Sequence, residues 1–361
     1  MSNWTTTTLG ELVTFQRGHD LPKSKMKRGL YPVIGSNGII GYHNDFTTEA
    51  PGITIGRSGN TGKPFLIKTR SWSHNTTLYI KEYRDADPLF MYYFLHTLRL
   101  GEYAGGSAVP TLNRNHIHGI AVTVPDLDSQ RKIAFVLDSI DRMVELNTQE
   151  NDYLAELAMA IYVEELEYSE DELPDGWSFQ PLSDFFPIKT GKKDANISTE
   201  KGKYPFFTCS QKPITADCYS FDGAAILVAG NGDFNVKWYQ GKFEAYQRTY
   251  VLMPNDQKLL GYLYCAVKRN LDNITAGARG SVIKFITKGN IADHVIAVPP
   301  HPAENQVVLR LNTILECIDA RVAEIKVLEE LRDTLLPKLM SGEIDVSKVD
   351  LTQLNNHLCE R

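Results

Sequence analysis

The pattern of hydrophobic positions is most regular between residues 130 and 167, a stretch without glycine or proline. Asn147 and Asn151 interrupt it with polar side chains. Roughly 38 residues rising ~1.5 Å each give a helix of about 57 Å, too long for an ordinary globular domain. The apolar residues alternate steps of four and three, the spacing of a coiled-coil seam, and are Ile133, Leu137, Ile140, Val144, Leu154, Ala158 and Ile161.

The residues before this helix follow a different pattern. Residues 1–125 hold short apolar runs separated by loops rich in Gly, Ser and Asn, which predict short strands joined by turns. One apolar helix is predicted at 89–100. After the long helix, Leu-Pro-Asp-Gly-Trp at 173–177 marks a break. A second block of the same mixed type is predicted at 173–300.

The two blocks are copies of each other at an offset of 173 to 174 residues. Tyr-Pro-Val-Ile at 31–34 matches Tyr-Pro-Phe-Phe at 204–207, and Val-Thr-Val-Pro at 122–125 matches Ile-Ala-Val-Pro at 296–299. The long helix also has a second copy at 305–341. Its first four seam positions fall there on Leu311, Leu315, Ile318 and Val322.

The repeat predicts an α+β fold with two tandem domains of short strands and helices, separated and followed by long helices. Two matched seams most simply pair with each other, as an antiparallel coiled coil with internal pseudo-two-fold symmetry. The predicted segments are a first domain at 1–125, a helical spacer at 126–172, a second domain at 173–300, a second spacer at 301–346 and a C-terminal tail at 347–361.

Charge is distributed unevenly along the chain. The overall net charge is −6, but residues 1–125 carry +5, residues 126–173 carry −11, residues 174–300 carry +4 and residues 301–361 carry −4. Long solvated helices are often rich in Glu, which is one explanation of the acidic segments. The other is that the basic blocks face a polyanion and the acidic helices face protein.

Targeting features and thiols indicate a cytoplasmic protein. The chain has no long apolar run of the kind that spans a membrane, and its first residues lack a basic region followed by an apolar core. The five cysteines form no CxxC pair, so we expect reduced thiols rather than disulfides or a zinc site.

Four segments carry a resemblance to a known family: 106–117 (GSAVPTLNRNHI), 130–147 (QRKIAFVLDSIDRMVELN), 173–185 (LPDGWSFQPLSDF) and 331–346 (LRDTLLPKLMSGEIDV). With them, nearly the whole chain resembles the specificity (S) subunit of a Type I restriction-modification system. The second block departs from its partner, because 280–291 lacks the Pro-Thr-Leu-Asn core.

The resemblance implies a DNA-binding protein without catalytic activity of its own. Each block would be a target recognition domain that reads one half of a split double-stranded DNA target. The helices would set the gap between the halves and bind two methyltransferase subunits. Those subunits would use S-adenosylmethionine for DNA methylation, and restriction (motor and nuclease) subunits would use ATP and Mg. No cofactor is expected in this chain.

Catalytic motifs are not found in the sequence. A methyltransferase motif needs Asn or Asp before Pro-Pro-aromatic, but Pro299-Pro300 stands between Val298 and His301. A phosphate-binding loop ending at Gly62-Lys63 would need Gly at 57 and Ser or Thr at 64, where the chain has Arg and Pro. We expect neither a catalytic residue nor a metal site.

Polar and basic residues on the Gly-rich loops are the candidates for DNA contact, because phosphates need Lys, Arg or backbone N–H groups and base edges need Arg, Asn, Gln, Ser or Lys. A solvated loop residue is the alternative for each. The candidates in the first block are Arg17, Ser36, Asn37, Arg57, Ser58, Asn60, Lys63, His74 and Arg114. Those in the second are Lys189, Lys192, Lys193, Gln211, Lys212, Asn231, Asn235, Lys237, Arg248 and Arg279.

The first long helix also has candidates for binding partner subunits. Asn147 and Asn151 either fix the register of the helix pair or face outward where partner helices dock. The predicted subunit-binding residues are Met143, Leu146, Asn147, Asn151, Leu157 and Tyr162.

Two other functions stay open at this point. One is a stand-alone DNA-modifying enzyme with unrecognised motifs. The other is a repeat scaffold that binds protein or glycan, for which the absence of salt-sensitive DNA binding would speak.

Overall fold

The computed structural model describes residues 4–105, 110–280, 284–347 and 349. The chain forms two compact units: unit 1 comprises residues 1–146 and 325–361, and unit 2 comprises residues 147–324. Each unit contains one of the two predicted mixed blocks together with part of each long helix. The five predicted segments and the two units are therefore different divisions of the same chain.

Both long helices are present close to their predicted limits. Helix α4 spans Leu127–Glu165 and helix α8 spans Gln306–Met340. Most predicted seam positions of α4 are buried or half-buried within their own unit. Val322 of α8 differs, because it is 53% exposed. Its neighbour Arg321 faces α4, and successive helix residues point about 100° apart, so Val322 is turned away.

Ion pairs join α4 to α8 inside each unit. Because the residue number on α8 falls as the number on α4 rises, the two helix segments of unit 2 run in opposite directions. In unit 2 the pairs are Glu150–Arg321 at 2.7 Å and Glu165–Arg310 at 2.6 Å, and in unit 1 the pair is Asp141–Arg332 at 2.8 Å.

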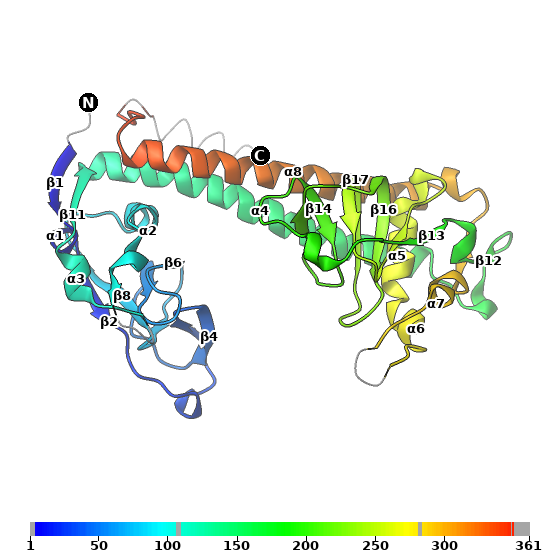
Figure 1. Ribbon diagram of the computed structural model, residues 1–361, viewed down its shortest axis with the longest axis horizontal. Coiled ribbons are helices and arrows are strands. Elements are labelled where there is room, and N and C mark those ends of the chain that lie inside the picture. Colours follow the sequence, from blue (N-terminus) through cyan, green and yellow to red (C-terminus); the bar gives the residue numbers. More distant parts are fainter. Residues whose placement is uncertain (1–3, 106–109, 281–283, 348, 350–361) are drawn as a thin grey trace. The chain divides into compact units, whose positions relative to one another are not determined.

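Unit 1 is built from short strands and short helices (Figure 1). A four-stranded antiparallel sheet has the order β2 (Val13–Arg17), β8 (Thr77–Tyr83), β5 (Gly52–Gly56) and β6 (Pro64–Ile67). A second sheet has the order β4 (Gly38–His43), β3 (Tyr31–Gly35) and β7 (Trp72–Ser73), with β3 and β7 parallel. Two further pairs are β1 (Trp4–Thr8) with β11 (Ala121–Pro125) and β9 (Ala104–Gly105) with β10 (Thr111–Leu112); the helices are α1 (Leu9–Leu12), α2 (Pro88–Thr97) and α3 (Arg114–His118).

Unit 2 repeats this arrangement in one larger sheet. Its order is β13 (Ile188–Thr190), β18 (Thr249–Leu252), β16 (Phe221–Ala229), β17 (Val236–Ala245), β14 (Tyr204–Phe207) and β15 (Ile214–Ala216). As in unit 1, one pair, β14 with β17, is parallel. The pair β12 (Ser178–Pro181) with β19 (Val295–Val298) corresponds to β1 with β11, and the helices are α5 (Leu260–Arg269), α6 (Leu271–Thr275) and α7 (Lys288–Ala292).

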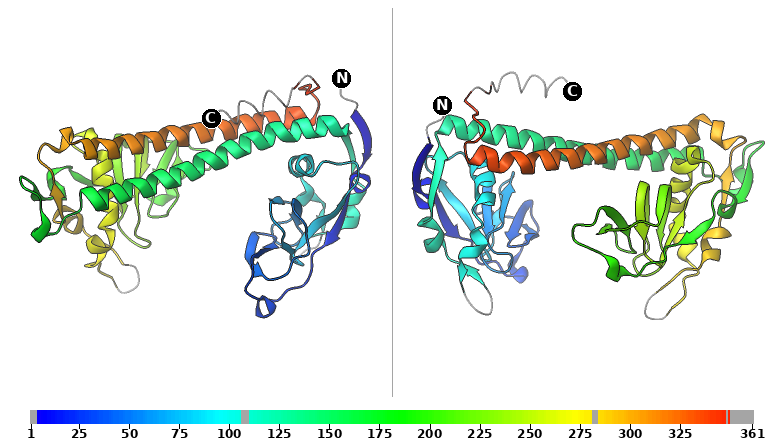
Figure 2. Two further views of the ribbon diagram at one scale, coloured as in Figure 1. Left: turned by 180° about the vertical axis from the view of Figure 1, so that it is seen from behind. Right: turned by 45° about the horizontal axis from the view of Figure 1, so that its top comes forward.

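One apolar helix in each unit fixes the sheet against a long helix. Helix α2 begins where the Asp87 carboxylate accepts a hydrogen bond from Phe90 N at 3.0 Å, with Pro88 in its first turn. Its Phe90 and Phe94 join one hydrophobic core with Leu137 of α4. In unit 2, α5 lies against α8 (Figure 2), where Gly261 allows its backbone to approach Leu311.

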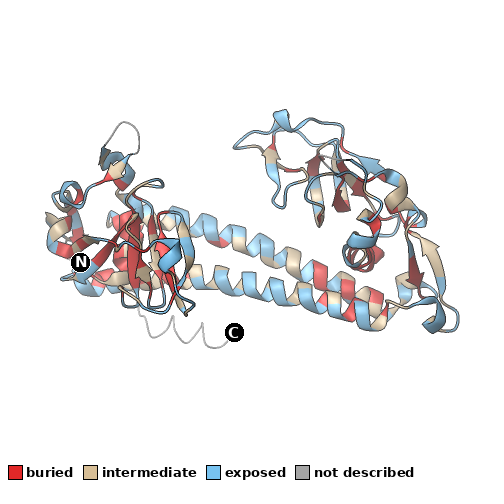
Figure 3. Cartoon of the chain, turned by 90° about the horizontal axis from the view of Figure 1, so that it is seen from below, coloured by how far each residue is buried: buried red, intermediate tan, exposed pale blue. Residues whose placement is uncertain are grey.

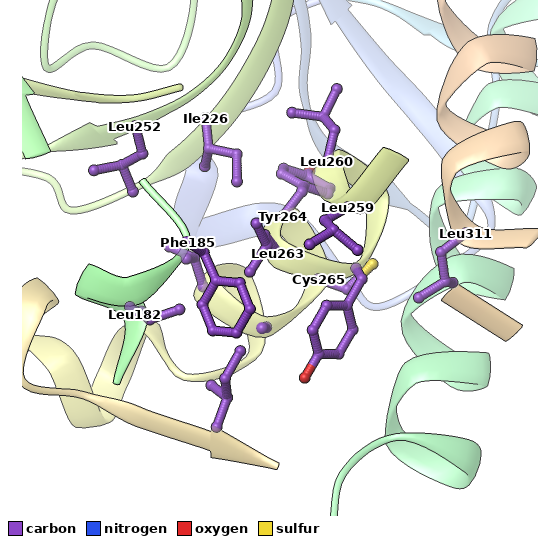
Figure 4. Packing of buried hydrophobic residues seen from close by; sticks show 14 of the residues in the cluster. Leu182, Phe185, Ile226, Leu252, Leu259, Leu260, Leu263, Tyr264, Cys265 and Leu311 are labelled. Atoms are coloured by element: carbon purple, nitrogen blue, oxygen red, sulfur yellow. The ribbon is translucent and has the colours of Figure 1, made fainter. Parts of the chain in front are cut away.

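The hydrophobic core of unit 2 joins α5 to α8. Figure 4 shows α5 residues Leu260, Leu263 and Cys265 between the sheet and Leu311 of α8. Each such side chain contributes roughly 1.5–3 kcal/mol when fully buried. In Figure 3 many strand residues are buried, whereas the long helices alternate buried and exposed positions. Helix α5 is also buried over most of its length.

Candidate nucleic-acid interface

Four predicted residues of unit 1 meet around the backbone and side chain of Thr76. Ser36 N donates a hydrogen bond to Thr76 Oγ1 at 3.3 Å, and His74 Nδ1 lies 3.0 Å from the same oxygen. Arg57 N and Ser58 N both donate to the Thr76 carbonyl, at 2.8 and 3.2 Å. Three loops that are distant in the sequence are thereby held at one edge of the sheets.

Three predicted arginines, Arg17, Arg57 and Arg114, line one pocket of about 450 Å³ at this edge. Burial and the nearby charge of Arg17 lower the pKa of the Arg57 guanidinium. The Arg57 backbone is fixed by Leu112 N, which donates to its carbonyl at 2.8 Å. No acidic residue is among the described residues that line the pocket, which are Gln16, Arg17, Arg57, Leu78, Thr111, Leu112, Asn113 and Arg114. The pocket is therefore suited to an anion or to the acceptor edge of a base.

The other predicted residues of unit 1 lie apart from this pocket. Asn37 and Asn60 are exposed in their loops. Lys63 lines a different pocket of about 340 Å³, together with His96 and Arg99, and its Nζ lies 5.6 Å from the centre of the Phe65 ring. The structure therefore groups Arg17, Arg57 and Arg114 but not Lys63.

In unit 2, three predicted residues brace one loop. Lys237 Nζ donates to the Ser210 carbonyl at 2.7 Å and also to Asn235 Oδ1. Asn235 is buried, and its amide donates to the Cys209 and Asp233 carbonyls at 2.8 and 2.7 Å. The third residue, Gln211, donates from Nε2 to Asp233 Oδ2 at 2.9 Å. Lys237 and Asn235 thus shape the loop 208–212, and burial lowers the pKa of Lys237.

The remaining residues of unit 2 lie on neighbouring loops. Asn231 and Arg279 both pair with Phe285 through isolated β-bridges. The Arg248 carbonyl accepts from Gly230 N at 2.8 Å, and Lys193 pairs with Tyr246. The Lys193 side chain is exposed, as are those of Lys189 on β13 and of Lys192 and Lys212 in loops.

The two units hold these loops with the same backbone framework. In each, a glycine at the start of a loop donates to a strand: Gly18 N to Thr77 O at 3.0 Å, and Gly191 N to Thr249 O at 3.2 Å. Further pairs match at offsets of 172 to 174 residues, namely His19–His74 with Lys193–Tyr246, Ser58–Thr111 with Asn231–Phe285, and Val33–Trp72 with Phe206–Glu244. The side chains at matched positions differ, so the same backbone framework carries a different set of side chains in each unit.

The predicted subunit-binding residues of α4 fall into different environments. Leu146 and Leu157 are 58% and 48% exposed, and Met143 is half-buried. Asn147 Nδ2 and Asn151 Oδ1 are buried and have no hydrogen-bond partner within the described part of the chain.

Tyr162 lies in the core of unit 2 instead of on its surface. It is 2% exposed, and its ring centre lies 5.9 Å from that of Tyr262. Its side chain is covered by the unit itself.

The sequence reasoning did not select Thr76, Gln16 or Asn113. Asn113 had a signal, because it belongs to the Pro-Thr-Leu-Asn core of the resemblance; its carboxamide accepts from Asn115 N at 3.0 Å and caps α3. No signal in the sequence indicates Thr76 or Gln16, since their positions depend on pairing between distant strands.

Metal and membrane features are not seen in the described ranges. No group of three His, Cys, Asp or Glu side chains there could hold a metal ion. No helix among the described residues is long and apolar enough to cross a membrane.

Comparison with known proteins agrees with this architecture. The Type I restriction modification DNA specificity domain matches twice, at residues 1–156 and 174–330. A crystal structure of the S subunit of a Type I restriction-modification system from M. genitalium has the same fold, with a TM-score of 0.61 and 17% identity over 94% of this chain and 96% of that one.

Curated relatives include specificity subunits from two organisms. The Escherichia coli Type I restriction enzyme EcoDI specificity subunit is 39% identical over 180 residues, which are 49% of this chain and 40% of that protein. The Methanocaldococcus jannaschii MjaIX specificity subunit is 24% identical over 305 residues, 72% of this chain and 70% of that protein. The match thus spans less than half the length of the E. coli relative. The resemblance seen in the sequence is confirmed, and the chain belongs to the family of the Type I restriction modification DNA specificity domain.

Proposed function

We propose that this chain is the DNA sequence-specificity subunit of a Type I restriction-modification complex and recognises a bipartite target, one half with each unit. The observation that carries the proposal is the shared loop framework of the two units. The same backbone pairs at matched positions hold a set of loops at the corresponding sheet edge of each unit. The side chains on these loops differ between the units, so they would read different bases. Loss of either set would then affect one half of the target only.

The long helices would act as the spacer between the two halves. In this proposal α4 and α8 pair along their length as an antiparallel coiled coil, and the two units are related by a pseudo-two-fold axis. Three ion pairs between the helices support this arrangement. In an antiparallel pair the residue number falls on one helix as it rises on the other, so the two numbers of each contact have nearly the same sum. This holds for Asp141–Arg332, Glu150–Arg321 and Glu165–Arg310. A fixed spacer suits split targets, as in dimeric readers with a set distance between half-sites.

The chain would supply specificity and no catalysis. Two methyltransferase subunits would bind the helices, with exposed Leu146 and Leu157 among the contacts. They would bring S-adenosylmethionine, and restriction subunits would bring ATP and Mg; this chain's residues would position the DNA. The arginine pocket of unit 1 supports this role, because its guanidinium groups suit phosphates or guanine edges.

Mapping of methylated bases tests the proposal directly. The chain is expressed with its methyltransferase in a host that lacks other systems, and the methylated motif is read by long-read sequencing. A split motif is expected, and exchange of residues 1–125 for those of another specificity subunit should change one half only. An unsplit motif, or methylation by the purified chain alone, would contradict it.

A further inference from the structure

The positive charge of residues 1–125 is concentrated in four cations that are not among the predicted DNA contacts. Residues 21–44 hold four Lys or Arg and no Asp or Glu. The rest of residues 1–125 holds nine Lys or Arg and eight Asp or Glu. Nearly all of the net charge of +5 therefore comes from Lys23, Lys25, Lys27 and Arg28.

These four side chains are exposed and have no ion-pair partner among the described residues. Two cations elsewhere in unit 1 are paired: Lys68 with Glu145 and Arg70 with Glu49, both at 2.8 Å. An unpaired cluster of like charges is self-repelling, so it costs stability unless an anion neutralises it.

The backbone of the segment is anchored, so the cations are presented from a fixed support. Lys23–Lys25 form a short 3₁₀ helix, closed by Met26 N donating to the Lys23 carbonyl at 3.2 Å. Lys27 N donates to His43 Nδ1 at 3.0 Å. Gly29 lies so close to the His43 carbonyl that a Cβ there would be 2.2 Å from it. A fixed support lowers the entropy lost on binding.

This support connects the cations to the candidate interface. His43 ends β4, and the other end of β4, Gly38, follows exposed Asn37. Strand β4 has six residues; at ~3.3 Å per residue its ends are about 17 Å apart, equal to about five base pairs of B-DNA at ~3.4 Å each.

We propose that Lys23, Lys25, Lys27 and Arg28 form a phosphate-contact strip that binds the DNA backbone outside the bases read by unit 1. The inference rests on the proposed function and adds contacts to it. The partner is the sugar-phosphate backbone of duplex DNA, because side chains this long and flexible suit point-charge contacts and carry no base-reading geometry. The strip lies up to about five base pairs from the Asn37 end of β4.

Unit 2 has no counterpart of this strip. The matched segment 194–217 holds three lysines and three acidic residues, a net charge of zero. The footprint of the complex should therefore extend further on the side of unit 1 than on the side of unit 2.

The test uses the full chain in complex with its methyltransferase and a duplex carrying the mapped motif. The variant K23Q/K25Q/K27Q/R28Q is compared with K201Q/K203Q/K258Q/K288Q, which removes four exposed lysine charges from unit 2. Binding is measured from ~0.05 to ~0.3 M salt. Each lost phosphate contact lowers the slope of log Kobs against log salt by about 0.9, so the first variant should lower it by ~2–4 and the control by less than ~1.

Duplexes with shortened flanks locate the contact. Removal of flanking base pairs on the unit 1 side should weaken binding by the wild-type complex and not by the strip variant. Three outcomes would each refute the phosphate-contact strip. They are equal slope changes in both variants, a changed methylation motif, and loss of methyltransferase assembly with an unchanged slope. Absence of sequence-specific binding by the wild-type complex would instead refute the proposed function.

Discussion

Asp141 Oδ1 accepts a hydrogen bond from Arg332 Nη1 at 2.8 Å, and this pair joins the two long helices within unit 1. The other carboxylate oxygen accepts from the Tyr93 hydroxyl at 2.7 Å. One carboxylate thus connects α2, α4 and α8. Burial and this hydrogen bond raise the pKa of Tyr93.

Substitution D141A should lower the free energy of unfolding of unit 1 by about 2–4 kcal/mol, because buried Tyr93 and half-buried Arg332 lose their acceptor. The matched control is D333A, since Asp333 also pairs with Arg332 but is exposed; its cost should be about 0–0.5 kcal/mol. Urea unfolding followed by circular dichroism measures both. A cost for D141A no larger than that of D333A would refute the structural role.

The matched glycines Gly18 and Gly191 should each be essential to one unit. A Cβ on Gly18 would lie 2.1 Å from the His74 carbonyl oxygen, and one on Gly191 would lie 1.9 Å from that of Ala245. Alanine at either position must displace a loop, at a cost of about 1–3 kcal/mol. We expect each substitution to impair methylation at one half-site motif and leave the specificity of the other unchanged.

Alanine at Gly105 or Gly119 is the matched control, because no described residue lies within 4 Å of a Cβ at either position. Melting temperature and motif fidelity are measured for all four variants. Equal effects on both halves from Gly18→Ala would contradict independent reading by the two units.

The long helices and the repeat could be predicted from the sequence because their causes are local. The four-and-three spacing over 130–161 is read without knowledge of any partner. The Gly-rich loops that hold Ser36 and Arg57 are likewise visible from turn chemistry. Their meeting with His74 around Thr76 is not local.

The features that could not be predicted from the sequence depend on contacts between distant residues. The helical pattern predicts an accessible Tyr162, but Tyr262 of α5 packs against its ring. Val322 continues a regular seam in sequence, yet the helix turns it outward. Thr76 and Gln16 enter the interface only because β8 pairs with β5 and β2. Periodicity identifies a face of a helix but not what covers it.

The arginine pocket of unit 1 should contribute base or phosphate contacts in its own half-site. R57Q is expected to weaken binding by about 5- to 150-fold if the guanidinium forms a bidentate base contact worth ~1–3 kcal/mol. Relaxed methylation at one base of one half would identify a base contact, and uniform weakening would identify a phosphate contact. R99Q is the control, since Arg99 is exposed and lies in a different pocket. No difference between R57Q and R99Q would exclude the pocket from DNA binding.

Acid should destabilise unit 1 through His118. Its Nε2 accepts a hydrogen bond from Phe15 N at 3.0 Å, which requires the neutral ring. Burial, with the charges of Arg114 and Arg84, lowers the pKa of His118 below 6.5. The folded state therefore binds fewer protons than the unfolded one, and the stability from this group is present above about pH 6.5 and lost as the pH falls through the lowered value.

Replacement by glutamine isolates this contribution. H118Q keeps an acceptor that could meet Phe15 N but does not titrate, so the loss of melting temperature between about pH 7 and pH 5 should be smaller than in the wild type. H116Q is the control, because His116 is exposed. His96 and His294 also have a lowered pKa through burial, so part of the acid sensitivity should remain. If H118Q and H116Q have the same dependence on pH as the wild type, the hydrogen bond to Phe15 does not set the acid stability of unit 1.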